Sequence, residues 1–177
     1  SYRVQPVLGA QYIVANPRPA APDDVGGSVR AAAFNVLNYF SNTTDQGRVC
    51  GPTGTAECRG ADNAAEQQRQ RAKIVNALHV LDAHVVGLME IENDVDDAAL
   101  ADLVAGLNDV AGAGTYSFVN TGGPVGNDAI KVAIIYQPRV VTPFGSPAIP
   151  WAQATGATGR RWPRPSKTRV AGASRSW

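Results

Sequence analysis

An apolar run that ends abruptly in carboxylates places the strongest constraint on how this chain can fold. Residues 85–89 read Val-Val-Gly-Leu-Met, and residues 90–94 read Glu-Ile-Glu-Asn-Asp. A short apolar run of this length is typical of a buried strand. Open α/β sheets keep their ligand sites at the carboxyl ends of their strands. Glu90 is therefore the first candidate for a functional carboxylate, and Glu92 is its rival.

A second apolar run, at residues 29–40, contains one polar side chain in its middle. The period of two in a strand places four side chains on one face: Ala31, Ala33, Asn35 and Leu37. The opposite face is apolar as well, which predicts a strand that is buried on both sides. A buried amide must be hydrogen-bonded. Asn35 is therefore either a structural amide or part of a functional site.

Two further stretches have the apolar spacing of helices. Asn63 followed by Glu66 is a capping-box pattern and predicts a helix from residue 63 to about 81. Its apolar stripe is expected to contain Ile74, Ala77, Leu78 and Leu81, with residues 67–69 at its start and on its outer side. Asp96 is expected to cap a second helix, whose stripe is Leu100, Leu103, Val104 and Leu107, and which Gly112 and Gly114 end.

The order of the expected elements defines the fold class. Additional strands are predicted at 82–89, 116–119 and 129–136, and a long loop at 41–61. Strand, helix, strand, helix, strand, strand is the order of an α/β fold. The sequence therefore predicts an α/β unit over residues 29–149. Residues 1–28, which are punctuated by proline and glycine, are expected to be a linker from a missing upstream region.

Two cysteines, Cys50 and Cys58, flank a loop rich in glycine, proline and threonine. A disulfide that closes this loop would suit an oxidising compartment, and two free thiols are the alternative. A zinc site is not favoured, because no second pair of cysteine or histidine residues stands at ligand spacing.

The charge of the chain is divided unevenly. Its net charge is +1, but the residues from Arg160 onward include six basic side chains and no acidic ones. The remainder has 10 basic against 15 acidic residues, a net charge of −5. If this acidic part of the chain binds phosphate, a metal ion is needed between the protein's carboxylates and the phosphate. No apolar run approaches the roughly 18 residues that span a membrane.

Four sequence patterns, in their order along the chain, resemble the endonuclease/exonuclease/phosphatase superfamily, whose fold is that of DNase I. The most similar branch is that of the large secreted bacterial nucleases. The matching patterns are Phe34-Asn35, the loop between Cys50 and Cys58, Leu88-Met89-Glu90, and Gly-Asn-Asp-Ala-Ile-Lys-Val at 126–132. The resemblance covers residues 29–148. That branch has Tyr-Arg-Pro where this chain has Tyr-Gln-Pro at 136–138.

The resemblance implies a metal-dependent phosphodiesterase that hydrolyses DNA outside the cell. Glu90 would hold Mg²⁺ or another divalent cation such as Mn²⁺ or Ca²⁺, and Asn35 would orient a catalytic carboxylate or the phosphate. Asp128 and Lys131 are candidate substrate contacts. Neither a membrane nor a protein partner is implied. A phosphomonoesterase or a lipid phosphodiesterase on the same scaffold is the alternative, as is a catalytically dead fragment.

The superfamily domain has two α/β halves that lie back to back in a four-layer α/β/β/α sandwich, and this chain matches the first half only. The family's catalytic histidine and its aspartate partner, its Gly-Asp-Phe-Asn segment and its Ser-Asp-His segment come from the second half. None of these motifs occurs here, so the chain as given is expected to be inactive.

From about residue 150 the composition changes and all periodicity is lost. The three tryptophans of the chain lie here, among arginine, proline, serine and glycine. One interpretation is a disordered basic tail that binds nucleic acid. The preferred one is out-of-frame translation: in a shifted frame, synonymous codons from Ala154 onward can spell the family's Asn-Arg-Pro-Ala-Leu-Ala-Gln-Thr-Phe segment.

Overall fold

The computed structural model describes residues 23–149 and, upstream of them, positions 5, 7–11, 13, 15–16 and 19. The segment 150–177, predicted to be an out-of-frame or disordered tail, lies outside the described residues, as does part of the predicted linker. The described part contains a four-stranded mixed sheet, a two-stranded hairpin and two α-helices. This confirms the predicted α/β class.

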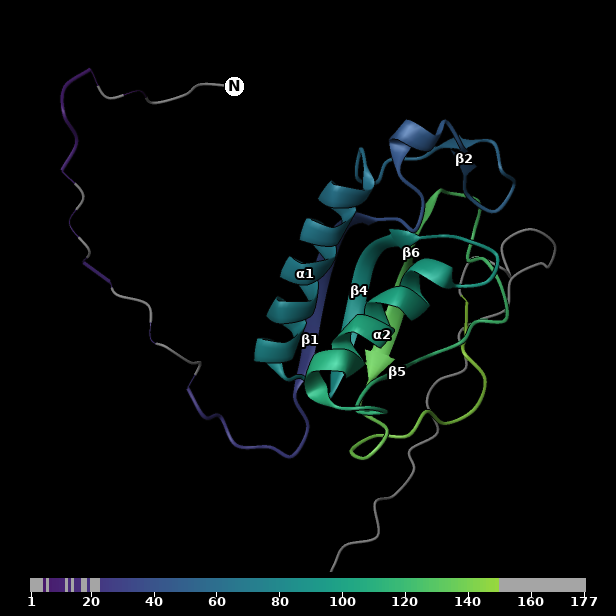
Figure 1. Ribbon diagram of the computed structural model, residues 1–177. Coiled ribbons are helices and arrows are strands. Elements are labelled where there is room, and N and C mark those ends of the chain that lie inside the picture. Colours follow the sequence, from purple (N-terminus) through teal and green to yellow (C-terminus); the bar gives the residue numbers. More distant parts are fainter. Residues whose placement is uncertain are drawn as a thin grey trace, which may run out of the picture.

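The four-stranded sheet has the order β1-β4-β6-β5 (Figure 1). Strand β1 (Ala31–Tyr39) is parallel to β4 (Val85–Glu92), as expected for two strands joined through a helix. Strand β6 (Ile130–Tyr136) is antiparallel to β4 and to the short β5 (Ser117–Phe118). All four predicted strands are present. The second, however, ends three residues later than predicted.

The segment 41–61, predicted as a loop, contains regular structure. A 3₁₀ helix covers Thr44–Gln46, and β2 (Val49–Cys50) pairs with β3 (Ala56–Glu57) in an antiparallel hairpin. Cys50 and Cys58 form a disulfide, which confirms the predicted pairing. With Phe40 and Ala129, the two cysteines form a small second core at one end of the sheet.

Loss of the disulfide is expected to lower the free energy of unfolding by about 2 to 3 kcal/mol, because the unfolded chain regains the entropy of the closed loop. Urea denaturation of the oxidised chain and of the Cys50→Ser/Cys58→Ser variant measures this difference. Alkylation of both thiols in native protein from an oxidising compartment would show that the bond does not form there.

The two helices begin at different kinds of cap. Helix α1 (Ala64–Leu81) begins at Asn63, whose side chain accepts a hydrogen bond from the backbone N of Glu66 at 3.0 Å, as predicted. Helix α2 (Ala98–Ala111) does not begin with a cap at Asp96, so that prediction was wrong. Instead, the Asp94 carboxylate reaches forward to the backbone N of Ala99, at 2.9 Å. Neither helix is long and apolar enough to cross a membrane.

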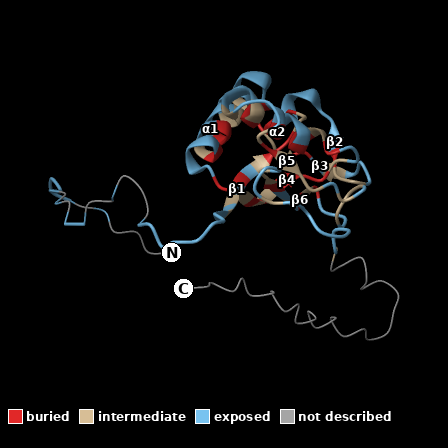
Figure 2. Ribbon diagram, turned by 90° about the horizontal axis from the view of Figure 1, so that it is seen from below, coloured by how far each residue is buried: buried red, intermediate tan, exposed pale blue. Residues whose placement is uncertain are grey.

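Both helices pack on one face of the sheet (Figures 1 and 2). The main core lies between them and the inward side chains of the strands: Val36, Val86, Leu88, Ile91 and Ile135. On the opposite face, Leu37, Val132 and Ile134 are 73%, 55% and 46% exposed. The prediction that residues 29–40 are buried on both sides was therefore wrong for the described part of the chain. We call the uncovered side of β1, β4 and β6 the open face.

Candidate active site

The pairing of β1 with β4 breaks at the level of both predicted site residues. The strands are in register as far as Asn35 and Met89, and pairing resumes at Tyr39 and Ile91. On the other side of β4, the pairing with β6 shifts between Leu88 and Ile91. Glu90 therefore lies inside the strand, at a β-bulge, rather than after the strand end as predicted. Bulges are frequent beside active sites, where they redirect a side chain.

The backbone at this break adopts an unfavourable conformation in both strands. Leu37, Asn38 and Glu90 have φ angles of 56°, 50° and 63°, in the left-handed region that glycine prefers. Such residues cost on the order of 1 to 3 kcal/mol each and persist only where their surroundings hold them, commonly at functional sites. This observation points to the break as a site, independently of any sequence pattern.

Asn35 joins the two irregular segments through its side chain. Its Nδ2 donates to Glu90 Oε1 at 2.8 Å, and its Oδ1 accepts from the backbone N of Leu37 at 2.7 Å. Because the Leu37 N–H can only donate, the amide oxygen must face it, and the amide NH₂ group must face Glu90. The structure thus brings Asn35 and Glu90 together. Asn35 is both a structural amide and a direct neighbour of the candidate metal ligand.

Glu90 lies on the wall of an open cavity of about 430 Å³. The remaining walls come from Met89, from the 125–128 loop and from residues 130–132 of β6. Asp128 lies on this wall, is exposed, and forms an ion pair with Arg59 at 2.6 Å. The backbone N–H of Ile130 and the Arg59 guanidinium lower the pKa of Asp128. This candidate substrate contact is therefore an anion at the cavity mouth.

The rival carboxylate, Glu92, is engaged in a structural role. Its side chain is buried, and its Oε2 accepts from the backbone N and from the Oγ of Ser41, both at 2.7 Å. Asn42 Nδ2 lies 3.4 Å from the other oxygen. These bonds fasten the segment after β1 to β4. Among the described residues, the Glu90 side chain has a hydrogen bond only from Asn35, to Oε1, so its Oε2 is free of hydrogen-bond partners there.

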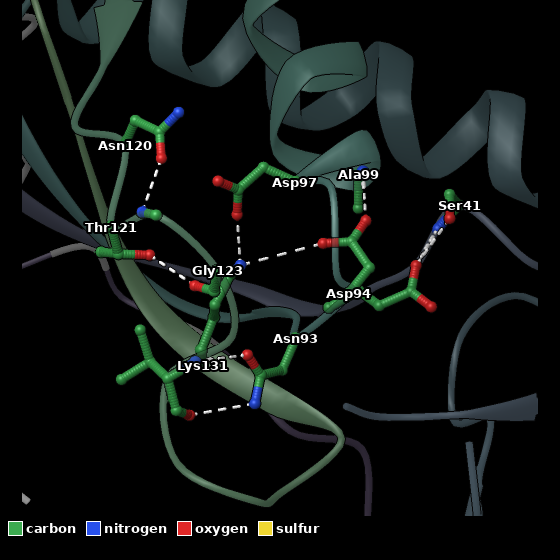
Figure 3. Close-up of polar contacts among 12 residues, drawn as sticks. Ser41, Asn93, Asp94, Asp97, Ala99, Asn120, Thr121, Gly123 and Lys131 are labelled. Atoms are coloured by element: carbon green, nitrogen blue, oxygen red, sulfur yellow. Dashed lines mark hydrogen bonds and ion pairs between the residues drawn. The ribbon is translucent and has the colours of Figure 1, made fainter. Parts of the chain in front are cut away.

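Lys131 lines the same cavity, but its ammonium group is paired on the helix side of the sheet (Figure 3). Its Nζ pairs with Asp97 Oδ1 and lies 3.8 Å from Asp94 Oδ1, and its side chain is 2% exposed. Burial raises the pKa of Asp94, and the charge of Glu92 raises it further. Contact between Lys131 and a substrate phosphate would require this buried pair to open.

Asn93 is a residue that the sequence did not single out. It is fully buried, and its Oδ1 accepts from the backbone N of Val125 at 2.8 Å (Figure 3). Its Nδ2 donates to the carbonyls of Val125 and Asp128, at 2.9 and 2.8 Å. Asn93 therefore holds the 125–128 loop that forms one wall of the cavity. The only sequence signal was its place directly after the strand.

The donor set fits a weakly held Mg²⁺ better than a closed metal centre. Among residues 23–149 and the few described positions before them, no group of three or more histidine, cysteine or acidic side chains could hold a metal ion. Mg²⁺, however, keeps several waters and is commonly bound through one or two carboxylates together with a substrate phosphate. One carboxylate on the wall of an open cavity matches that requirement. His84 is not part of this donor set, because its Nδ1 accepts a hydrogen bond from the backbone N of Arg30.

Comparisons of the chain with models of known protein families, with curated proteins and with solved structures found no match.

Proposed function

We propose that this chain supplies the metal-binding half of a Mg²⁺-dependent phosphodiesterase site, in a secreted nuclease that hydrolyses DNA. One observation carries the proposal: the Asn35–Glu90 hydrogen bond lies where the backbones of β1 and β4 are both irregular. The order of the sequence patterns that resemble the endonuclease/exonuclease/phosphatase superfamily supports it. Asn35 belongs to the first of those patterns and Glu90 to the third.

Each of the two side chains has a distinct role in the proposed site. Glu90 would hold the cation, with Mn²⁺ or Ca²⁺ as alternatives to Mg²⁺. The Asn35 amide occupies Glu90 Oε1 and so leaves Oε2 for the metal. A bound cation would stabilise the negative charge that develops on the phosphoryl group. The chain before Arg160 has a net charge of −5, so the cation would also mediate contact with the polyanionic substrate.

The open face supports the proposal that the site needs a second layer. A sheet that is apolar on both faces is normally covered on both, yet Leu37, Val132 and Ile134 are exposed on the open face. In the superfamily, the second half lies against this face and brings the histidine that serves as general base. We therefore expect the residues of this chain to bind the cation without completing the hydrolytic site.

The disulfide is evidence on the compartment in which the protein is located. Disulfides persist in oxidising environments and are rare in the cytosol. The Cys50–Cys58 bond thus supports the proposed extracellular location.

Two proteins test the function: the 177-residue chain, and an extended protein in which residues 1–149 are joined to a second half that carries the superfamily's catalytic motifs. With Mg²⁺, the extended protein should cleave plasmid DNA, and EDTA should stop it, whereas the 177-residue chain should be inactive. Cleavage of a phosphomonoester or a phospholipid instead of DNA would make the substrate assignment wrong. An extended protein that folds and hydrolyses none of these substrates would remove the proposed function.

A further inference from the structure

Helix α1 contacts β1 through two glutamines that lie one turn apart. Gln70 Nε2 donates to the carbonyls of Val36 and Leu37, at 3.1 and 2.7 Å. Gln67 Nε2 donates to the carbonyls that follow the strand, those of Phe40 and Ser41, at 2.7 and 3.0 Å. Each amide therefore uses both of its N–H bonds on two consecutive backbone carbonyls.

The irregular end of β1 explains why a primary amide is suited to these positions. The left-handed conformation of Leu37 and Asn38 interrupts the pairing with β4, so carbonyls in this segment lose their ladder partners. Backbone carbonyls in a partly buried segment need donors from elsewhere. A glutamine side chain offers two donors in one plane, which is what two adjacent carbonyls require.

A chain of hydrogen bonds connects Gln70, through the backbone of Leu37 and the side chain of Asn35, to the candidate metal ligand Glu90. Gln70 holds the carbonyl of Leu37, the backbone N of Leu37 donates to Asn35 Oδ1, and Asn35 Nδ2 donates to Glu90 Oε1. The Leu37 side chain is 73% exposed and lies on the open face, so its burial contributes little to holding the strained backbone. Gln70 is thus the contact from the helix layer that holds Leu37 in this conformation.

We propose that Gln70 is a positioning residue for the Asn35–Glu90 pair. It holds Leu37 in the left-handed conformation, and thereby keeps the Asn35 amide against Glu90 and the second carboxylate oxygen toward the cavity. The expected effect on cation affinity rests on the proposed function. The expected effect on the position of the Asn35 amide does not.

Side-chain amide signals of Asn35 in ¹⁵N-labelled 177-residue chain report the position of this group directly. Gln70→Met keeps the length of the side chain and removes both donors, so we expect the Asn35 signals to move to the shifts of a solvated amide. Mn²⁺ added to the wild type should broaden these signals in a way that depends on Glu90. In Gln70→Met, the same titration should show about five-fold weaker binding, the factor equivalent to one net hydrogen bond.

Gln67→Met is the matched control. It also removes two hydrogen bonds from a glutamine amide to consecutive carbonyls, but these carbonyls belong to Phe40 and Ser41, which are not hydrogen-bonded to Asn35. It should lower the melting temperature about as much as Gln70→Met and leave the Asn35 signals in place. Gln70→Lys, which keeps a donor, should restore them. The proposal is overturned if Gln70→Met leaves the Asn35 signals unchanged, if Gln67→Met moves them equally, or if Gln70→Lys restores nothing. Moved signals without any Mn²⁺ broadening in the wild type would keep the positioning role and count against the metal site.

Discussion

Replacement of Glu90 by glutamine should lower Mg²⁺-dependent cleavage of DNA by the extended protein by about 10³-fold, which is the scale of losing a main electrostatic stabiliser of the transition state. Glutamine keeps the size of the side chain and its hydrogen-bonding capacity toward Asn35, but it removes the charge that would hold the cation. The loss should appear in kcat/KM for plasmid cleavage, with the fold intact by circular dichroism.

Glu92→Gln is the control for this experiment, because Glu92 lies two residues further along the same strand and is bonded to Ser41. We expect it to lower stability, since a buried carboxylate that accepts several bonds is replaced, and to reduce activity much less than Glu90→Gln. Wild-type activity in Glu90→Gln, together with a large loss in Glu92→Gln, would transfer the metal-binding role to Glu92.

Lys131→Met should lower the free energy of unfolding by about 3 to 5 kcal/mol, the range for breaking a buried ion pair by removing one partner. The Lys131 side chain is 2% exposed, and its removal leaves the buried carboxylate of Asp97 and the partly buried carboxylate of Asp94 without a counter-charge. Urea denaturation measures the difference. Arg30→Met is the matched control, because the Arg30–Asp82 pair is 59% exposed on both sides, and exposed pairs contribute about 1 kcal/mol or less.

The destabilisation in Lys131→Met should depend on pH. Burial raises the pKa of Asp94 in the folded state, and Lys131 opposes that shift. A raised pKa favours folding only while the group is protonated, and this contribution is lost as the pH rises through the folded-state value. Without Lys131, the pKa rises further. The variant should therefore be more strongly destabilised at pH 7 than at pH 4, and an equal loss at both would exclude Asp94 from the effect.

The elements that the sequence predicted are those with clear apolar periodicity. The predicted stripe of α2 lies entirely in the main core. In α1, Ile74 and Leu78 lie in that core as predicted, but Leu81 is 42% exposed and Val75 is buried instead. In β1, burial alternates although the sequence is apolar on both faces, because only one face meets the core.

The proximity of Asn35 and Glu90 could also be predicted from the sequence, because neighbouring parallel strands bring equivalent positions together. The bulge at Glu90 could not be predicted. A glutamate with a left-handed backbone conformation has no local sequence signal, because that conformation depends on contacts from other elements.

Two side-chain contacts differ from what the helix patterns indicated. Gln67 lies in the first turn of α1, as expected, but its side chain donates to the carbonyls of Phe40 and Ser41, which follow the irregular end of β1. Asp96 was expected to cap α2, but Asp94 reaches Ala99 from a residue near the end of β4. In the first case, the pattern along α1 did not reveal which carbonyls the segment after β1 leaves without ladder partners. In the second case, the pattern along α2 did not reveal which nearby carboxylate reaches the N–H groups of its first turn.

The position of β1 makes the two borders of the sheet unequal. One border is β5, which has two residues, and the other is β1, which has nine residues and neither a charge nor a proline. Within the described part of the chain, no strand pairs with the outer side of β1. Its first half therefore presents a row of backbone groups that can template another strand. The sheet can grow from the border beside Asn35, so any added strand would lie next to the proposed cation site.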